Sequence, residues 1–259
     1  MISSAPWAAL AHATFEYAGI ALGLWLYRRA RARNGQEAMS ARGSFALMCG
    51  LLIGAAIGNK AVYLVERPDV WLAFWRDGAA LQLGQSIVGG LLGGLIGIEI
   101  AKGLSRQPAS TGDLMVLPLM AGMALGRVGC FVAGLHDDTY GLPTGLPWAV
   151  DLGDGIGRHP APLYEVGALA VMAAWLHVLA PLARRVPGLS FKWFLAAYLI
   201  WRLVCDGLKP VPVAYVGGLS GIQWVCLLAL CVYLPIVVSA TRAALRRSGG
   251  QAGAVSWKP

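Results

Sequence analysis

Several ionisable side chains fall within or at the ends of long apolar stretches of the sequence. They are Glu16, Lys60, Glu99, Arg127, Glu165, Arg202 and Asp206. A charge in hydrocarbon is costly, so each of these groups must face a partner or a wet cavity. Arg202, Asp206 and Lys209 have i, i+4, i+7 spacing, which places a cation, an anion and a second cation on one helix face. Both a structural Arg202–Asp206 pair and a functional site fit this pattern.

Four of the cations could converge on one anionic group. Lys60, Arg127, Arg202 and Lys209 are all expected in the outer halves of apolar segments. Planar guanidinium groups suit a pair of phosphate oxygens, and a phospholipid headgroup is the anion available at that depth. The charge pattern therefore suggests a site that uses a phospholipid.

The segments that carry these groups have the composition of membrane spans. The chain has 259 residues, of which 57% are hydrophobic and 13% charged, and its mean hydropathy is +0.61. This apolar surface exceeds what one soluble core could hide, and a bilayer-spanning helix needs about 20 mostly apolar residues. We expect an all-α polytopic membrane protein, a single transmembrane domain over residues 1–259. Its seven predicted spans lie at about 6–27, 44–65, 84–104, 113–134, 161–183, 189–209 and 217–240.

Lys and Arg are distributed unequally between the two ends of these spans. Fourteen lie in or beside the first, third and fifth connecting segments and the C-terminal tail. On the other side are five, Arg67, Arg76, Arg127, Arg158 and Lys209. The positive-inside rule then predicts an N-terminus outside and a C-terminus in the cytoplasm. The net charge of +8 is therefore explained by membrane orientation, and nucleic acid is not an expected partner.

Two segments expected on the outer face are too polar to be spans. Residues 66–83 contain Trp71 and Trp75, which suit a membrane–water interface. Residues 135–160 are rich in Gly, Pro and Asp, which favour turns over helix. The second segment is long for a connecting loop, and loops of that length are often functional. A solvated cap without chemistry is the alternative.

The third predicted span contains overlapping G-x-x-x-G steps. Gly89, Gly93 and Gly97 form one series, Gly90 and Gly94 a second, with similar steps at Gly19/Gly23 and Gly54/Gly58. Small residues at this spacing let helix backbones approach closely, and such a helix could also leave backbone open to a lipid headgroup. A nucleotide site is disfavoured, because there is no G-x-x-x-x-G-K-[ST] pattern and no preceding strand.

The five cysteines lack the C-x-x-C spacing of a zinc site or a redox pair. We expect buried structural thiols. No dinucleotide fingerprint or serine-hydrolase motif is present, so the sequence predicts neither a metal nor a cofactor.

Five short motifs lie between residues 58 and 207: G-N-K-A-V-Y at 58–63, V-G-G-L-L-G at 88–93, G-R-V-G-C-F-V-A-G at 126–134, R-H-P-A-P-L-Y-E at 158–165 and W-R-L-V-C-D-G at 201–207. Their order and spacing resemble the prolipoprotein diacylglyceryl transferase family, and Gly221-Ile222-Gln223 resembles its final-helix Gln motif. The resemblance implies a seven-helix enzyme of lipoprotein biosynthesis in the bacterial inner membrane. Such enzymes move a diacylglyceryl group from phosphatidylglycerol to the lipobox cysteine of a prolipoprotein and release glycerol phosphate.

The resemblance also implies roles for individual residues. Arg127 and Arg202 would hold the phosphate and stabilise the departing glycerol phosphate. The residues expected to bind substrate or to pack around it are Tyr17, Lys60, Gly89, Gly90, Gly129, Gly134, Tyr164, Glu165, Asp206 and Gln223. The implied partners are phosphatidylglycerol, the lipobox segment and membrane lipids.

Three motifs of the family pattern lose polar side chains here. Val88 stands for the His of His-Gly-Gly-Leu, Cys130 for the Asn of G-R-x-G-N, and Ala133-Gly134-Leu135 for Asn-Gly-Glu. The acceptor thiol, with a free pKa of about 8.5, must lose its proton, and valine cannot take it.

The base must therefore come from elsewhere if the reaction is retained. His136 and His159 in the segment 135–160 are the candidates, because histidine has the most suitable ordinary pKa. His12 and His177 are more remote in the sequence.

Two other interpretations stay open. A relative with altered catalysis could bind anionic phospholipid or use another acceptor. A transporter or channel could use the same buried charges, but the sequence has no Pro-broken helix pairs in matching halves and no internal repeat.

Overall fold

The computed structural model describes residues 5–33, 41–78, 84–106, 110–137 and 139–252. The helices and strands in chain order are α1 (Ala5–Arg33), α2 (Ala41–Glu66), α3 (Pro68–Asp77), α4 (Ile87–Ser105), α5 (Gly112–Ala133), η1 (Gly134–His136), β1 (Val150–Asp151), β2 (Gly157–Arg158), α6 (Ala161–Val178), α7 (Ala180–Ala183), α8 (Leu189–Cys205), η2 (Asp206–Leu208), η3 (Val216–Gly218) and α9 (Gly221–Ala252). The all-α prediction is confirmed, since strand is confined to one two-residue pair in the part of the chain described.

The long helices have the composition and the surface of membrane spans. Five helical segments among the described residues are long and apolar enough to cross a bilayer: Gly43–Glu66, Ile87–Ser105, Gly112–His136, Ala161–Val178 and Gly221–Arg247. Large apolar side chains point outward along them, and on α2 Leu52, Ile53 and Ile57 are each at least 60% exposed. In water such a face would be unfavourable, whereas in lipid it is the expected surface. The chain is therefore a multi-pass membrane protein.

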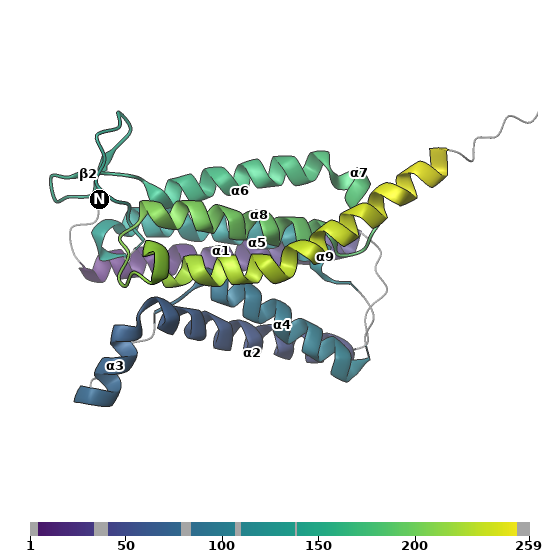
Figure 1. The fold of residues 1–259 in the computed structure, drawn as a ribbon, viewed down its shortest axis with the longest axis horizontal. Helices are drawn as coiled ribbons and strands as arrows, with labels where there is room; N and C mark the ends of the chain where they lie inside the picture. Colours follow the sequence, from purple (N-terminus) through teal and green to yellow (C-terminus); the bar gives the residue numbers. More distant parts are fainter. Residues whose placement is uncertain (1–4, 34–40, 79–83, 107–109, 138, 253–259) are drawn as a thin grey trace, which may run out of the picture.

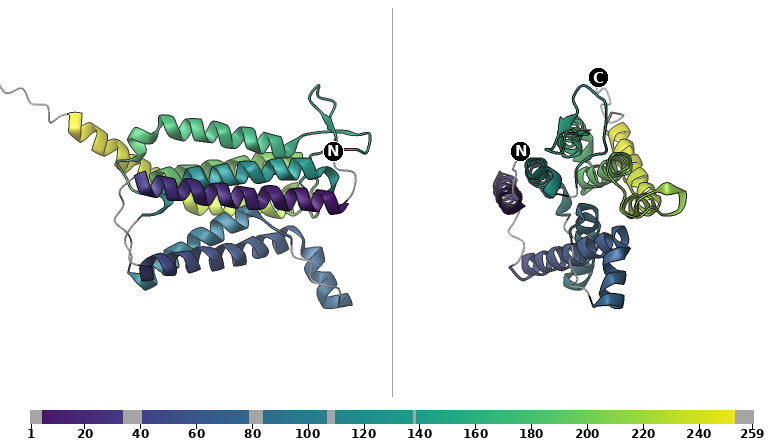
Figure 2. Two further views of the ribbon diagram at one scale, coloured as in Figure 1. Left: turned by 180° about the vertical axis from the view of Figure 1, so that it is seen from behind. Right: turned by 90° about the vertical axis from the view of Figure 1, so that its left-hand side faces the viewer.

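The helices form two groups that lie side by side (Figures 1 and 2). Helices α1, α5, α6, α8 and α9 run alongside one another, and the α2–α4 pair covers one side of this group. Helix α8 is the most buried, with Phe194, Leu195, Tyr198 and Leu199 fully enclosed. Its N-terminus is capped by Asp113 of α5, whose carboxylate accepts the backbone N–H groups of Gly188 at 2.6 Å and Phe191 at 3.1 Å.

Glycines allow α2 and α4 to approach backbone to backbone. A Cβ atom on Gly89 would lie 2.1 Å from the carbonyl oxygen of Gly58, and one on Gly93 would lie 2.2 Å from that of Gly54. Neither position could carry a side chain without separating the helices. The packing role predicted for the G-x-x-x-G steps is confirmed. Gly90 differs, because a Cβ there would meet open space.

The segment 66–83 contains a helix that the sequence analysis did not predict. Arg67 precedes Pro68 at the start of α3, and Gly78, with φ +60°, ends it in the left-handed conformation. Proline in the first turn and glycine after the last are the ordinary signals of a short helix. Residues 79–83 lie outside the described residues.

The segment 135–160 is built of turns, as predicted. After η1 it contains the antiparallel β1–β2 pair, in which Val150 is opposite Arg158. The Asp151 carboxylate accepts three backbone N–H groups of the connecting turn, at 2.8 to 3.1 Å. Asp154 pairs with Arg158 at 2.6 Å, and that guanidinium holds the pKa of the Asp154 carboxyl below its ordinary value. Asp138 lies outside the described residues.

Candidate functional site

Three helices meet at one fully buried carboxylate, Glu165 near the start of α6. Tyr198 of α8 donates its hydroxyl to Glu165 Oε1 at 2.6 Å. Arg202, one turn further along α8, donates from Nη1 to Glu165 Oε2 at 3.3 Å. Arg127 of α5 brings Nε within 2.9 Å of the same oxygen. Glu165 thus holds two guanidinium groups side by side in the interior.

The second half of the cluster joins α8 to the start of α9. Arg202 Nη2 donates to Asp206 Oδ1 at 2.7 Å, so the predicted Arg202–Asp206 pair is confirmed. The Ser220 hydroxyl donates to the other oxygen of Asp206 at 2.5 Å. Gln223 accepts the Ser220 backbone N–H at 2.9 Å and donates to the Leu203 carbonyl at 2.8 Å. Gln223 therefore fixes the chain around the cluster.

Some cationic N–H groups in this cluster have no hydrogen-bond acceptor. The buried Nε atom of Arg202 has no hydrogen-bond partner, and that of Arg127 is engaged only in its 2.9 Å ion pair with Glu165. Lys209, only 7% exposed and close to both arginines, makes no side-chain hydrogen bond or ion pair within the described part of the chain. Glu165 and Asp206 both accept from protein donors. Unused cationic donors at a dry site suit an anion such as a phosphate.

The structure brings Arg127 and Arg202 together at Glu165, and the buried Lys209 interacts electrostatically with both. Their convergence on a lipid phosphate stays a prediction. Lys60 donates instead to the Gly84 carbonyl at 2.9 Å, a bond that ties α2 to the segment leading into α4. The neighbouring Asn59 accepts the Ser86 backbone N–H at 3.0 Å, and Ser86 caps α4. A substrate-binding role for Lys60 stays a prediction.

The two histidines predicted as bases lie in the segment 135–160. His159 Nδ1 is 3.2 Å from the Tyr164 hydroxyl, which accepts the indole N–H of Trp148 at 2.7 Å. His136, at the end of η1, is exposed and makes no side-chain hydrogen bond among the described residues. No hydrogen bond or ion pair in the described structure joins either histidine to the cluster around Glu165.

The remaining predicted residues have varied surroundings. Tyr17 on α1 is 71% exposed, whereas Val88 on α4 is 1% exposed within the core. Gly129 faces Phe15 so closely that a Cβ there would lie 2.6 Å from the phenylalanine Cβ. Gly134 ends α5 with φ +64°, a conformation that favours glycine.

Two members of this cluster, Tyr198 and Ser220, and one residue beside it, His12, were not predicted from the sequence. Tyr198 could have been found, because it precedes Arg202 by one helical turn. Ser220 gave no signal. His12, treated as remote, lies on α1 with its Nε2 atom 3.8 Å from Cys130 Sγ, and Arg127 Nη1 is 3.7 Å from the same sulfur.

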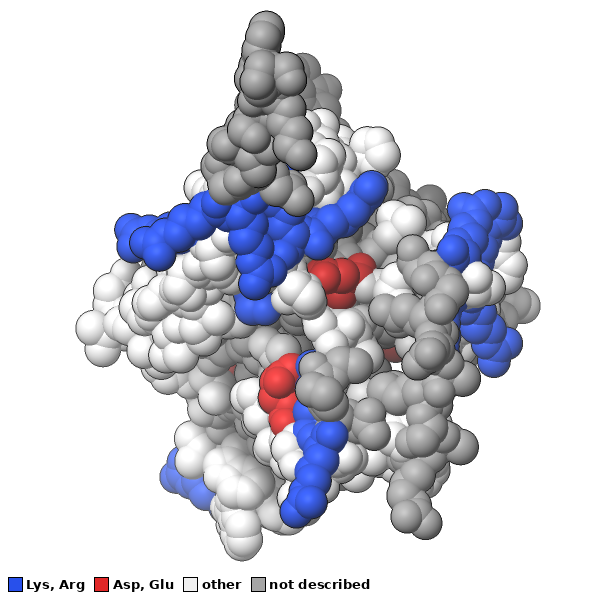
Figure 3. Space-filling model, turned by 90° about the vertical axis from the view of Figure 1, so that its right-hand side faces the viewer, with Lys and Arg blue, Asp and Glu red and all other residues white. Residues whose placement is uncertain are grey.

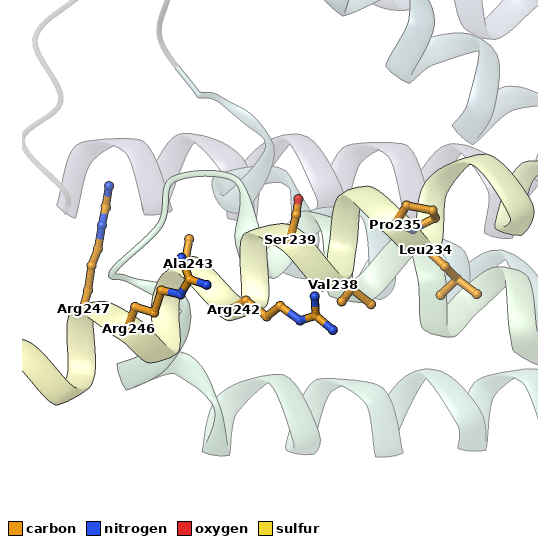
Figure 4. Close-up of a pocket in the computed structure, with 8 residues that line it drawn as sticks. All are labelled: Leu234, Pro235, Val238, Ser239, Arg242, Ala243, Arg246 and Arg247. Carbon is orange, nitrogen blue, oxygen red and sulfur yellow. The ribbon is translucent and has the colours of Figure 1, made fainter.

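A hollow of about 800 Å³ lies elsewhere, along the last turns of α9. Leu234, Pro235 and Val238 form part of its wall, and Arg242 and Arg246 lie further along the helix (Figure 4). None of the residues around Glu165 lines it.

The fold and the site define a class: a multi-pass membrane protein with a buried pair of arginines that can hold an anionic group. Residues 2–239 match the family model described as prolipoprotein diacylglyceryl transferase. The chain belongs to this family.

Curated relatives named phosphatidylglycerol–prolipoprotein diacylglyceryl transferase are similar over most of the chain. The protein of Polynucleobacter necessarius subsp. necessarius (strain STIR1) is 33% identical over 199 residues, 70% of this chain and 70% of the relative. That of Geobacter sulfurreducens is 30% identical over 230 residues, 82% of this chain and 84% of the relative. That of Cupriavidus pinatubonensis is 28% identical over 249 residues, 87% of this chain and 84% of the relative.

Proposed function

We propose that this protein transfers a diacylglyceryl group from phosphatidylglycerol to the lipobox cysteine of prolipoproteins in the bacterial inner membrane. The observation that carries the proposal is the buried pair Arg127 and Arg202, held on Glu165 with guanidinium donors unused. Family membership and the names of the relatives identify the substrates.

The geometry fits a reaction in which a phosphate leaves. The acceptor sulfur forms a bond to the terminal glyceryl carbon of the lipid, and the bond between that carbon and the phosphate oxygen breaks. The electron pair stays on the phosphate oxygen, so negative charge grows at the departing glycerol phosphate. Arg127 and Arg202 would stabilise this charge with preorganised donors in a dry site. Glu165, Tyr198 and Asp206 act through the arginines as positioning residues.

The experiment that tests the proposal uses purified protein, phosphatidylglycerol vesicles and a synthetic lipobox peptide. The expected product is a peptide whose mass has increased by one diacylglyceryl group in thioether linkage. The control peptide carries serine in place of the lipobox cysteine and should stay unmodified. Absence of a product from the cysteine peptide, with a family member as positive control, would refute the proposal.

We further propose seven spans with an outer N-terminus and a cytoplasmic C-terminus, α1 and α8 being the two additional spans. Basic side chains support this orientation, since they gather at the end of the bundle where α1 finishes (Figure 3). Arg31 and Arg33 lie in the last turn of α1, and Arg242, Arg246 and Arg247 lie near the end of α9. An excess of Lys and Arg marks the cytoplasmic side.

Reporter tags test this topology. A tag at residue 36, which lies outside the described residues, and one at the C-terminus should report the cytoplasm. A tag at Gly145, an exposed loop position where a Cβ meets open space, should report the outer side. A cytoplasmic signal at position 145 would overturn both the topology and the location of the site.

A second candidate is a relative that binds phosphatidylglycerol without transferring its lipid, or that uses another acceptor. Val88 favours it, because this side chain stands where the family has a histidine and is buried in the core.

Val88→His separates the two candidates. If the protein is a transferase, the wild type should be active and Val88→His should lower its stability by about 1–3 kcal/mol, because a buried imidazole lacks a partner. Transfer rate and thermal denaturation in detergent measure the two effects, and Val88→Asn is the polar control that cannot act as a base. An inactive wild type that gains transfer through Val88→His, but not through Val88→Asn, would establish the second candidate.

A further inference from the structure

A second group of polar side chains lies beside Arg127 and has no part in the function proposed above. It consists of His12 on α1, Cys130 on α5 and Asp137 just after η1. One donor atom from each residue lies within 4.8 Å of the other two. His12 Nε2 is 3.8 Å from Cys130 Sγ, and His12 Nδ1 is 3.7 Å from Asp137 Oδ2.

One buried polar atom of this group lacks a hydrogen bond. The Asp137 side chain is 9% exposed, and its buried Oδ2 atom has no hydrogen-bond partner. Its other oxygen accepts the Thr139 backbone N–H at 3.2 Å. A distance of 3.7 Å is too long for an N–H···O bond, and leaving a buried carboxylate oxygen unpaired is unfavourable. A ligand bound by the imidazole, the thiol and the carboxylate together would satisfy the unpaired oxygen.

These donors match those of a catalytic zinc site. A thiolate, an imidazole and a carboxylate bind Zn²⁺ at about 2.0–2.3 Å, and three protein ligands leave the fourth position of the tetrahedron open. The thiolate and the carboxylate offset the two charges of the ion, so the ion is compatible with Arg127 Nη1 at 3.7 Å from the sulfur. The ligands would be one imidazole nitrogen of His12, the Cys130 sulfur and one Asp137 oxygen, which lie within 4.8 Å of one another.

We propose that His12, Cys130 and Asp137 bind a zinc ion whose open position receives the acceptor thiol. The second half of this inference rests on the proposed function. The His12 side chain is 39% exposed, which leaves the group open on one side. A thiol bound to zinc is deprotonated, so its proton goes to solvent and the thiolate sulfur attacks the glyceryl carbon. The ion would thus promote deprotonation of the acceptor thiol, which Val88 cannot do.

Arg127 links the two parts of the reaction. Its Nη1 atom contacts Cys130, and its Nε atom lies 2.9 Å from Glu165 in the arginine cluster. A thiolate on the ion and a phosphate on the arginines would therefore both lie beside the same guanidinium group. Sulfur–carbon bond formation and carbon–oxygen bond cleavage can then occur on one bound lipid.

Cobalt binding tests the metal site without any measurement of activity. Protein stripped with a chelator should bind about one Co²⁺ per chain and develop the near-ultraviolet absorption of a cobalt–thiolate bond. Cys130→Ser should lose this absorption, while Cys231→Ser, at an exposed thiol on α9, should keep it. His12→Ala and Asp137→Asn should weaken zinc binding by about 100-fold or more, since even outer-shell changes cost about 10- to 100-fold. Unchanged absorption in Cys130→Ser, or none in the wild type, would overturn the site.

Addition of a lipobox peptide separates this inference from the proposed function. A cysteine peptide should shift the cobalt spectrum as a second sulfur binds, and its serine counterpart should not. Chelation of the wild type should abolish transfer, and zinc should restore it, which requires no variant to fold. Full transfer by protein proved metal-free would refute the zinc site and leave the transferase intact. A cobalt–thiolate spectrum in a protein that transfers nothing would refute the proposed function and leave the site.

Discussion

Arg127→Ala and Arg202→Ala should each lower the rate of diacylglyceryl transfer by about 30- to 1,000-fold. Each change removes a charged donor from a desolvated site that stabilises the leaving phosphate, a loss of about 2–4 kcal/mol. Both side chains are about 5% exposed, so water cannot replace the missing donor easily. The rate is measured with labelled phosphatidylglycerol and lipobox peptide, and membrane insertion is checked in parallel.

The lysine variants refine this test. Arg127→Lys and Arg202→Lys should recover little activity, because an ammonium group lacks the planar pair of donors. Arg76→Ala, at an exposed arginine near the end of α3, is the matched control and should transfer at the normal rate. Near-normal activity in both buried alanine variants would contradict the phosphate-binding role.

Glu165→Gln should destabilise the protein by about 3–5 kcal/mol, because it leaves two buried guanidinium groups without their shared counter-charge. Glu165 is fully buried and contacts Arg127, Arg202 and Tyr198. Arg202 keeps its pair with Asp206, but Arg127 has no other carboxylate partner among the described residues. Thermal denaturation in detergent measures the effect.

Glu99→Gln provides the control for this second substitution. Glu99 pairs with Lys102 at 2.7 Å, but its side chain is 59% exposed. Such a surface pair contributes about 0–1 kcal/mol, so this variant should denature close to the wild type. Equal denaturation temperatures for Glu165→Gln and Glu99→Gln would mean that the buried cluster is not a structural centre.

Features that depend on local spacing could be predicted from the sequence. Arg202 and Asp206 are one helical turn apart, and the structure pairs them. The G-x-x-x-G steps predicted close helix packing, and Gly58 and Gly89 do face each other. Both predictions follow from the period of an α-helix, so the sequence of one segment is sufficient to make them.

Features that depend on the order of helices in space could not be predicted in this way. Glu165 lies 38 residues after Arg127 and 37 before Arg202, and the spacing within one helix says nothing about their meeting. His12 is 118 residues from Cys130 and becomes its neighbour only because α1 packs along α5. The family resemblance named both arginines, but it could not indicate His12, since Cys130 departs from the family pattern.

The short helix α3 was missed for a different reason. Residues 66–83 were interpreted as an outer segment from their polarity and their interfacial tryptophans alone. Pro68 at the first turn and Gly78 after the last are local signals that a search for caps would have found.

The most direct test of the central claim is a transfer experiment with phosphatidylglycerol labelled separately in its acyl chains and in its headgroup glycerol. If the protein is a diacylglyceryl transferase, the acyl label appears on the cysteine peptide while an equal amount of headgroup label is released as glycerol phosphate. Release of glycerol phosphate without labelled peptide, or no release at all from a protein that still binds the lipid, would contradict the account.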